Sequence, residues 1–397
     1  MPTAEESEVI TLGLTPGIRV TGEDVQGEVS LNFVRLRSTP IEEVHVKLRG
    51  SVFTQITRQQ GDSTLTRRQR IELLRSTVSV WKRGSAYPPP GTDILRIPFR
   101  FNLIPSQTLP SCLFTSYRRS GRIVYSVEVV GVRSGLHFNK RLSNALSVVP
   151  PDAAGAAISQ KLRSGEVPSW RSIRFNKHVR RGIWGEYSNV EATLTLPSIN
   201  VFPIFTPIPF VLTIITTSKR MKKDETPENQ PIFPSPPLTP KGVEFTLTRA
   251  VMVRTHSWSE NGRDTVAAIG GLSPESSDPH FYDEVQIEGV EKTWIPSYGD
   301  EKKNKGSWRQ EVNFKSTFKL NCPPAFQSPT MGIQYILNLK IDFPGIGNDL
   351  KTEIPIVVVS SMLPPGAGAW DGPPQELDLP PAYFSTADVN HDEKDSE

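Results

Sequence analysis

The chain has 397 residues, which is enough for two or three domains whose cores are large enough to fold without covalent cross-links. Its 36 prolines and 28 glycines favour short strands and turns and argue against a helical bundle. A net charge of +3 is too small to indicate nucleic-acid binding, and two distant cysteines, Cys112 and Cys322, indicate neither a disulfide framework nor a CxxC site.

The amino terminus predicts a short leader, residues 1–9, without the basic and apolar regions of a signal peptide. The longest apolar stretch, residues 202–215, is broken by three prolines, so we expect no transmembrane helix. Together with the cysteine pattern, this favours a reducing, cytoplasmic location.

Residues 10–149 predict a first β-rich domain. Apolar and polar side chains alternate with period two over residues 18–36 and 41–53, as in half-buried strands. Two apolar runs follow at residues 94–104 and 123–132, and the second is apolar on both faces, which predicts a central strand.

Two segments depart from this pattern. Residues 54–75 are polar and basic, and predict an exposed excursion between strands. Residues 150–182 begin with PPDAAGAA and continue as a basic, weakly periodic stretch, which predicts an interdomain linker.

Residues 183–362 predict a second β-rich domain, with the cleanest period-two run at residues 331–341. Two polar insertions interrupt it, at residues 219–241 and 257–306. The first is rich in prolines and charges and is expected to stay disordered, while the second has room for one strand.

The remaining residues, 363–397, are rich in proline, glycine and acids, and predict a disordered tail. Within it lies the sequence Leu379-Pro380-Pro381-Ala382-Tyr383. The PPxY pattern is a ligand type for WW domains, which bind a preformed polyproline II helix and take the tyrosine into a second pocket.

Several motifs carry a resemblance to a known family. The pattern IPFRFNLIP…LPSCLF…G.IVYSVEV resembles the late part of an arrestin amino-terminal domain, and GxVxL at residues 27–31 followed by a strand ending at Gly50 resembles its opening. A proline-preceded IP-x-x-x-x-I strand resembles the carboxy-terminal domain. The resemblance covers about residues 10–362 and implies an all-β fold of two antiparallel immunoglobulin-like β-sandwich domains, followed by the disordered tail.

The tail motif is similar to the PY motifs that α-arrestins carry beyond their sandwiches. The resemblance implies that Pro380, Pro381 and Tyr383 recruit a WW-domain HECT-type ubiquitin ligase, while the sandwiches engage a membrane transporter or receptor. The protein would then be a non-enzymatic cytoplasmic adaptor, peripherally recruited to the plasma membrane or endosomes, that promotes ubiquitination and endocytosis of its cargo. Members of the family often carry two or more such motifs, and the single motif here removes the gain from avidity.

The alternative within the same clan is a signalling or trafficking scaffold that does not recruit a ligase, in which Tyr383 is incidental. A β-sandwich enzyme or a carbohydrate-binding module is a further alternative, because its site would lie on loops. The chain shows no GxSxG, no P-loop and no GxGxxG after a strand, and its six histidines are scattered without metal-ligand spacing. We therefore expect no enzyme activity, no metal and no cofactor.

Three further groups of residues are candidate sites. Clustered arginines are candidates for contact with anionic lipids or an acidic cargo segment, although solvated loops often carry such charge: Arg67, Arg68, Arg70, Arg118, Arg119 and Arg122. Loop lysines are candidate ubiquitin acceptors, with a merely solubilising role as the alternative: Lys219, Lys222 and Lys223. Ser235 and Thr239 each precede a proline and would suit a proline-directed kinase.

Overall fold

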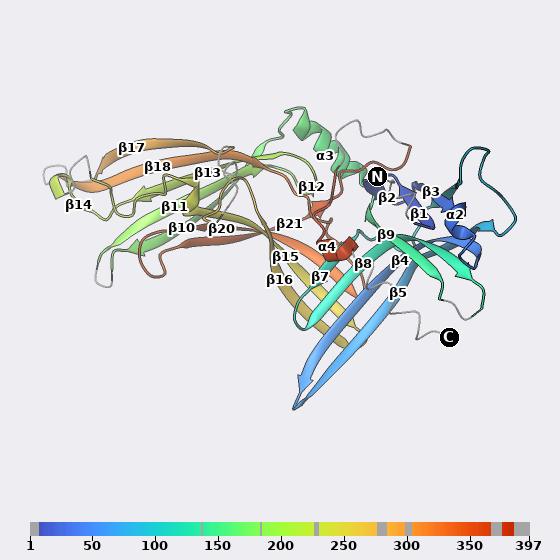
Figure 1. Ribbon diagram of the computed structural model, residues 1–397. Coiled ribbons are helices and arrows are strands. Elements are labelled where there is room, and N and C mark those ends of the chain that lie inside the picture. The colour runs from blue at the N-terminus through green and yellow to red at the C-terminus, as the bar shows by residue number, and fades with distance from the viewer. Residues whose placement is uncertain are drawn as a thin grey trace.

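The computed structural model describes residues 8–135, 138–182, 185–225, 230–275, 284–297, 304–366 and 375–384. Figure 1 shows two β-rich lobes that lie end to end. The predicted all-β class with two antiparallel sandwiches is confirmed. We call residues 10–149 the N sandwich and residues 170–359 the C sandwich. No helix among the described residues is long and apolar enough to cross a membrane.

The N sandwich contains two sheets. One has the order β1-β3-β6, and the other has the order β2-β9-β8-β4-β5 with β7 beside β8. The strands are β1 (Ile10–Leu14), β2 (Ile18–Val20), β3 (Asp24–Asn32), β4 (Ile41–Gln60), β5 (Ser63–Lys82), β6 (Ile94–Asn102), β7 (Cys112–Thr115), β8 (Arg119–Arg133) and β9 (Lys140–Val149), with the helical turn α2 (Phe33–Leu36). Among the described residues of this sandwich, only β2 and β9 pair in parallel.

The N-sandwich core follows the predicted alternation. Along β4 every second side chain from Val44 to Ile56 is buried, which places one face of the strand in the core. The two sheets approach closely at Gly131, where a Cβ atom would lie 2.8 Å from Cδ1 of Ile10. A larger residue at position 131 would therefore require the Ile10 side chain to shift.

The C sandwich also contains two main sheets. The first has the order β10-β11-β13-β18-β14 with β17 beside β18, and the second has the order β16-β15-β20-β19 with β21 beside β20. Its elements are β10 (Trp170–Arg180), β11 (Tyr187–Pro197), β13 (Ile208–Thr217), β14 (Met221–Lys222), η1 (Lys223–Glu225), η2 (Pro240–Gly242), β15 (Val243–Thr255), β16 (Trp258–Ala268), β17 (Gln286–Pro296), β18 (Lys305–Phe318), β19 (Phe326–Gln327), β20 (Met331–Ile341) and β21 (Leu350–Ile356). A parallel pair, β12 (Phe202–Pro203) and β22 (Val358–Val359), lies beside them.

Aromatic side chains fill the C-sandwich core. Phe210 and Phe318 come from one sheet and Phe245 from the other, and their ring centroids lie 5.2 to 6.0 Å apart in tilted and edge-on arrangements. Such edge-on packing adds to the free energy gained by burying the rings. The three rings hold the two sheets together.

The predicted linker, residues 150–182, differs from expectation because it contains regular structure. Asp152 caps a helix, α3 (Ala153–Arg163), by accepting from the backbone N–H of Gly155 at 2.9 Å. Strand β10 then begins at Trp170 and pairs along its whole length with β11. The connection between the sandwiches is therefore a short helix and the loop after it.

The predicted excursion at residues 54–75 is instead a long hairpin of β4 and β5, which projects beyond its sandwich in Figure 1. The hairpin touches the turn between β15 and β16 of the C sandwich. The guanidinium groups of Arg58 and Arg67 lie 4.8 and 4.5 Å from the ring centroid of Trp258, and Arg58 forms an ion pair with Glu260 at 2.7 Å. Thr54 and Thr255 are joined by a 3.1 Å hydrogen bond between their hydroxyls.

The two polar insertions also carry more structure than predicted. In the first, the disorder expected for residues 219–241 is wrong for residues 219–225, which include β14 and η1. It is also wrong for residues 230–241, where Ile232 is buried and Ser188 donates to the carbonyl oxygen of Phe233 at 3.1 Å. In the second, β16 and β17 supply two strands where room for one was expected. Residues 226–229, 276–283 and 298–303 of these insertions lie outside the described residues.

Candidate functional site

The PPxY motif lies against the body of the protein at the junction of the two sandwiches. Residues 375–384 form the last described segment, which we call the docked tail, and its helical turn α4 (Pro381–Phe384) lies beside β9 in Figure 1. Leu377, Leu379 and Tyr383 are only 5%, 8% and 4% exposed. The disorder expected for the tail therefore does not hold for these ten residues. The rest of the expected tail beyond residue 366, residues 367–374 and 385–397, lies outside the described part of the chain.

The Tyr383 hydroxyl is held in a polar pocket of the N sandwich. Its oxygen lies 2.7 Å from Oγ of Ser111, donates to the carbonyl oxygen of Leu146 at 2.9 Å, and lies 3.5 Å from the backbone nitrogen of Tyr125. Burial raises the pKa of the Tyr383 hydroxyl above its ordinary value, because the phenolate would lose its hydration. The tyrosine is thus held as the neutral phenol.

The pocket is built by the LPSC segment that the sequence singled out. The backbone N–H of Ser111 donates to the carbonyl oxygen of Val148 at 2.8 Å, and the N–H of Val148 donates to Oγ of Ser111 at 2.9 Å. Ser111 is fully buried, so both bonds are shielded from water. Strand β9 thereby fixes the serine that meets Tyr383.

The docked tail also contacts the C sandwich. The backbone N–H of Asp378 donates to the carbonyl oxygen of Asn321, just beyond β18, at 2.8 Å. Asp378 also borders a cavity of about 470 Å³ between the ends of β15, β16 and β18, which Lys319 and Cys322 help to line. One short segment of chain therefore touches both sandwiches.

The motif is not extended in this position. The N–H of Tyr383 donates to the carbonyl oxygen of Pro380 at 2.8 Å, which closes a helical turn. A polyproline II helix has no internal hydrogen bonds and keeps its backbone solvated. The conformation expected for a WW ligand is therefore absent from residues 380–383 in this structure.

The two N-terminal arginine clusters come together across β4. Arg70 and Arg122 lie opposite Phe53 on either side, and Arg122 stacks over that ring at 4.8 Å. Arg68 lies opposite Gln55 on the same face, and its Nε donates to the Gln55 side chain at 3.0 Å. We call this face, with Arg68, Arg70 and Arg122, the basic face.

The other three predicted arginines do not lie on the basic face. Arg67 and Arg119 lie on either side of Ile56, which follows Gln55 in β4. Because successive side chains of a strand point to opposite faces, these two arginines lie on the face of the sheet opposite to the basic face. Arg67 is engaged with the C sandwich, where it donates to Oγ of Ser257 at 2.8 Å. Arg118 is exposed in the turn between β7 and β8.

The predicted modification sites differ in exposure. Lys219 and Lys222 are exposed, and Lys219 pairs with Glu186 at 3.5 Å, whereas Lys223 is half-buried in η1. Thr239 is exposed just before η2, while Ser235 is half-buried beside two buried prolines. Of the two serine/threonine-proline sites, Thr239 is the more exposed.

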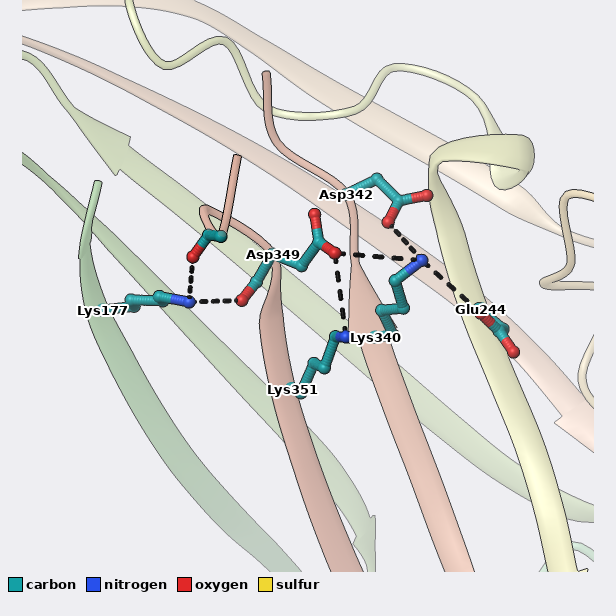
Figure 2. A network of polar contacts seen from close by, with 7 residues as sticks. Lys177, Glu244, Lys340, Asp342, Asp349 and Lys351 are labelled. Atoms are coloured by element: carbon teal, nitrogen blue, oxygen red, sulfur yellow. Dashed lines mark hydrogen bonds and ion pairs between the residues drawn. The ribbon is translucent and has the colours of Figure 1, made fainter. Parts of the chain in front are cut away.

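A second polar cluster, shown in Figure 2, fastens the turn between β20 and β21. Lys340 pairs with Asp342, Glu244 and Asp349 at 2.8, 3.8 and 4.0 Å. Lys177 of β10 donates to the carbonyl oxygens of residues 347 and 349, both at 2.7 Å. The charges largely balance one another, which indicates a structural role.

Neither cysteine forms a disulfide, and both are buried. Burial raises the pKa of Cys112 and of Cys322 to about 12, so both stay as unreactive thiols near neutral pH. No group of three or more His, Cys, Asp or Glu side chains that could hold a metal ion occurs within the described ranges.

The sequence predicts the PPxY motif but not the pocket in which Tyr383 lies. Leu377 and Leu379 are the sequence feature that could have indicated it, because apolar side chains two residues apart lie on one face of an extended segment and can be buried together. Ser111 had no signal beyond its place in the LPSC segment. No family model and no curated protein matches the chain.

Proposed function

We propose that the protein is a non-enzymatic, arrestin-like adaptor that recruits a WW-domain HECT-type ubiquitin ligase to a membrane transporter or receptor. The observation that carries this proposal is the Leu379-Pro380-Pro381-Ala382-Tyr383 sequence beyond two β-sandwiches. In this role the protein is cytoplasmic and reaches the plasma membrane or endosomes through its cargo. Its sandwiches contact the cargo, and its tail brings the ligase.

The test is binding of purified WW domains from HECT ligases to a peptide of residues 375–397. We expect the wild-type peptide to bind and a Tyr383→Ala peptide to lose most of its affinity, because the tyrosine fills one of the two pockets in such complexes. A peptide with Phe384→Ala is the matched control and should still bind. If the wild-type and Tyr383→Ala peptides bind equally weakly, the ligase arm of the proposal fails.

The second candidate is a scaffold of the same clan that recruits no ligase. The burial of Tyr383 favours it, since a buried tyrosine with hydroxyl partners has a structural role of its own. Cargo ubiquitination in cells separates the two candidates. Pro381→Ala should abolish it if the motif recruits a ligase, and should leave it unchanged if the protein is only a scaffold.

We also propose that the basic face contacts anionic lipid headgroups when the adaptor reaches a membrane. Arg68 and Arg70 are both exposed on β5, and each charge near an anionic surface contributes about 1 kcal/mol. Replacing both with glutamate should sharply reduce sedimentation with phosphatidylserine vesicles, and the wild-type binding should weaken as salt is raised.

The control for the lipid experiment is Arg171→Glu with Arg174→Glu, two exposed arginines on β10 of the other sandwich. It changes the net charge by the same amount. Equal loss in both double variants would show that net charge alone drives binding, and would remove the basic face from the proposal.

A further inference from the structure

Tyr383 is the one side chain that both the docked tail and a WW domain require. In the structure its ring is buried and its hydroxyl is bonded within the N sandwich. In a WW complex the same ring would have to enter a groove of the partner. The two states cannot coexist, because one side chain cannot occupy both pockets.

The backbone gives a second and independent reason. Docking closes the helical turn from Pro380 to Tyr383, whereas a WW domain takes the prolines as an extended polyproline II helix. Binding therefore requires that the turn open. Leu377 must also leave its buried position whenever the segment is pulled away as a unit.

The docked tail also joins the two sandwiches. Its Asp378 N–H is bonded to Asn321 of the C sandwich, and its Tyr383 hydroxyl is bonded to Ser111 of the N sandwich. Upstream, the chain is attached where Asp152 donates its backbone N–H to the carbonyl oxygen of Met362 at 2.8 Å. Removing the tail deletes one of the links between the sandwiches.

From these contacts we propose that the tail is an internal competitor of the WW domain, and that ligase binding is reciprocally coupled to the arrangement of the two sandwiches. This inference rests on the proposed ligase-recruiting function and concerns its regulation. A cargo that favours a different arrangement of the sandwiches would raise the affinity for the ligase, and the ligase would raise the affinity for that cargo by the same factor.

The loss of affinity for the WW domain depends on the fraction of chains in which the tail is docked. The apparent dissociation constant is the intrinsic one divided by the fraction of chains with a free motif. If about one chain in ten to one in a hundred has a free tail, the full chain binds a WW domain about 10 to 100 times more weakly than the free peptide does.

The first experiment compares three ligands for one purified WW domain by calorimetry: the peptide of residues 375–397, the full-length chain, and the full-length chain with Leu377→Asp. This substitution lies outside the PPxY motif and places a charge where the tail is buried. We expect the wild-type chain to bind at least about tenfold more weakly than the peptide, and Leu377→Asp to restore the affinity to within about twofold.

The matched control is Leu363→Asp, which changes an exposed leucine at the start of the same tail and should bind as the wild type does. Ser111→Ala removes a pocket partner without touching the tail and should act in the same direction as Leu377→Asp. If the wild-type chain and the peptide bind with equal affinity, the competition is overturned but the proposed function still stands. If the peptide does not bind at all, the proposed function fails, and the competition fails with it.

The second experiment tests the coupling through the distance between two labels. The native cysteines are buried with raised pKa values, so cysteines placed at exposed positions 85 and 351, one in each sandwich, can be labelled selectively. We expect both the WW domain and Leu377→Asp to shift or broaden the distance distribution measured by electron paramagnetic resonance. An unchanged distribution in both cases would overturn the coupling.

Discussion

At the scale of single residues, Ser111 decides where the Tyr383 hydroxyl can lie. The serine is bonded to β9 through both its backbone and its side chain, so it cannot turn away when the tail leaves. An empty pocket would therefore keep a buried hydroxyl without its phenol partner. The other bonds of this hydroxyl remain, because Oγ of Ser111 accepts from the backbone N–H of Val148 at 2.9 Å and donates to the carbonyl oxygen of Leu146 at 3.0 Å, so the pocket stays in place for the returning phenol.

The buried phenol makes docking sensitive to alkaline pH. Its pKa in the docked state is raised above the value of about 10 that it has when free. The stability that Tyr383 gives to docking is therefore fully present below about pH 10 and is lost as the pH rises through and beyond that value. We expect tyrosinate absorbance from this residue to develop only at a pH well above the midpoint of exposed tyrosines.

The measurement is the difference between the ultraviolet titration curves of the wild-type chain and of Tyr383→Phe. Tyr125 and Tyr335 are also buried with raised pKa values, but they are common to both chains and cancel in the difference. Tyr117, which is 96% exposed, provides the control through Tyr117→Phe. A Tyr383 midpoint equal to that of Tyr117 would contradict the docked position.

At the scale of secondary-structure elements, α3 is attached to the C sandwich at Gly155. A Cβ atom there would lie 2.1 Å from the backbone carbonyl oxygen of Ser360 and 2.9 Å from a methyl group of Val359. Alanine is normally favoured over glycine within a helix by about 1 kcal/mol. Here we expect Gly155→Ala to lower the free energy of unfolding instead, because the added methyl group would clash with backbone that cannot move aside. Such overpacking costs about 1–3 kcal/mol.

Chemical denaturation of Gly155→Ala measures this free energy of unfolding. Ala157→Gly is the control on the exposed face of the same helix, and should lose about 1 kcal/mol through helix propensity alone. If Gly155→Ala is more stable than the wild type, α3 does not pack as closely on β22 as described.

Strands that bury one face in the core could be predicted from the sequence. Strands that are exposed on both faces could not. The period-two run at residues 331–341 became β20, in which most side chains are buried. The hairpin of β4 and β5 was missed beyond residue 54 because most of β5 is exposed on both faces, so no alternation is required there. The sequence of β10 predicts a linker for the same reason, because nearly all of its side chains are exposed or half-buried.

The docked tail could not be predicted because its burial depends on residues far away in the chain. Composition correctly describes residues 375–384 as unable to form a core of their own. Tyr383 is bonded to Ser111 and to β9, and Asp378, which lies between the two buried leucines, is bonded to Asn321 of the C sandwich, so this burial depends on residues elsewhere in the chain. The joining of Arg70 and Arg122 on one face likewise depends on strand register, which places both beside Phe53.

At the scale of the whole molecule, the two sandwiches meet through several separate contacts. Arg249 of β15 donates to the carbonyl oxygen of Leu113 in β7 at 3.2 Å, while it also pairs with Asp264. A Cβ atom on Gly121 of β8 would lie 2.9 Å from the sulfur of Met331, so the sandwiches approach closely there as well. The Trp258 contact and the docked tail add to these, and the tail is the one that a WW domain would remove.

If Tyr383 serves both docking and ligase binding, as we propose, this shared use has a consequence for how the sequence can change over generations. Selection for the ligase alone would keep the motif and leave the Ser111 pocket free to drift, whereas selection for docking alone would keep the pocket and leave the two prolines free. A lineage under both demands should retain all of them together, and one that loses the tyrosine should soon accumulate changes at Ser111 and Leu377. The pattern of joint loss among descendants would thus record whether one tyrosine ever served both docking and ligase binding.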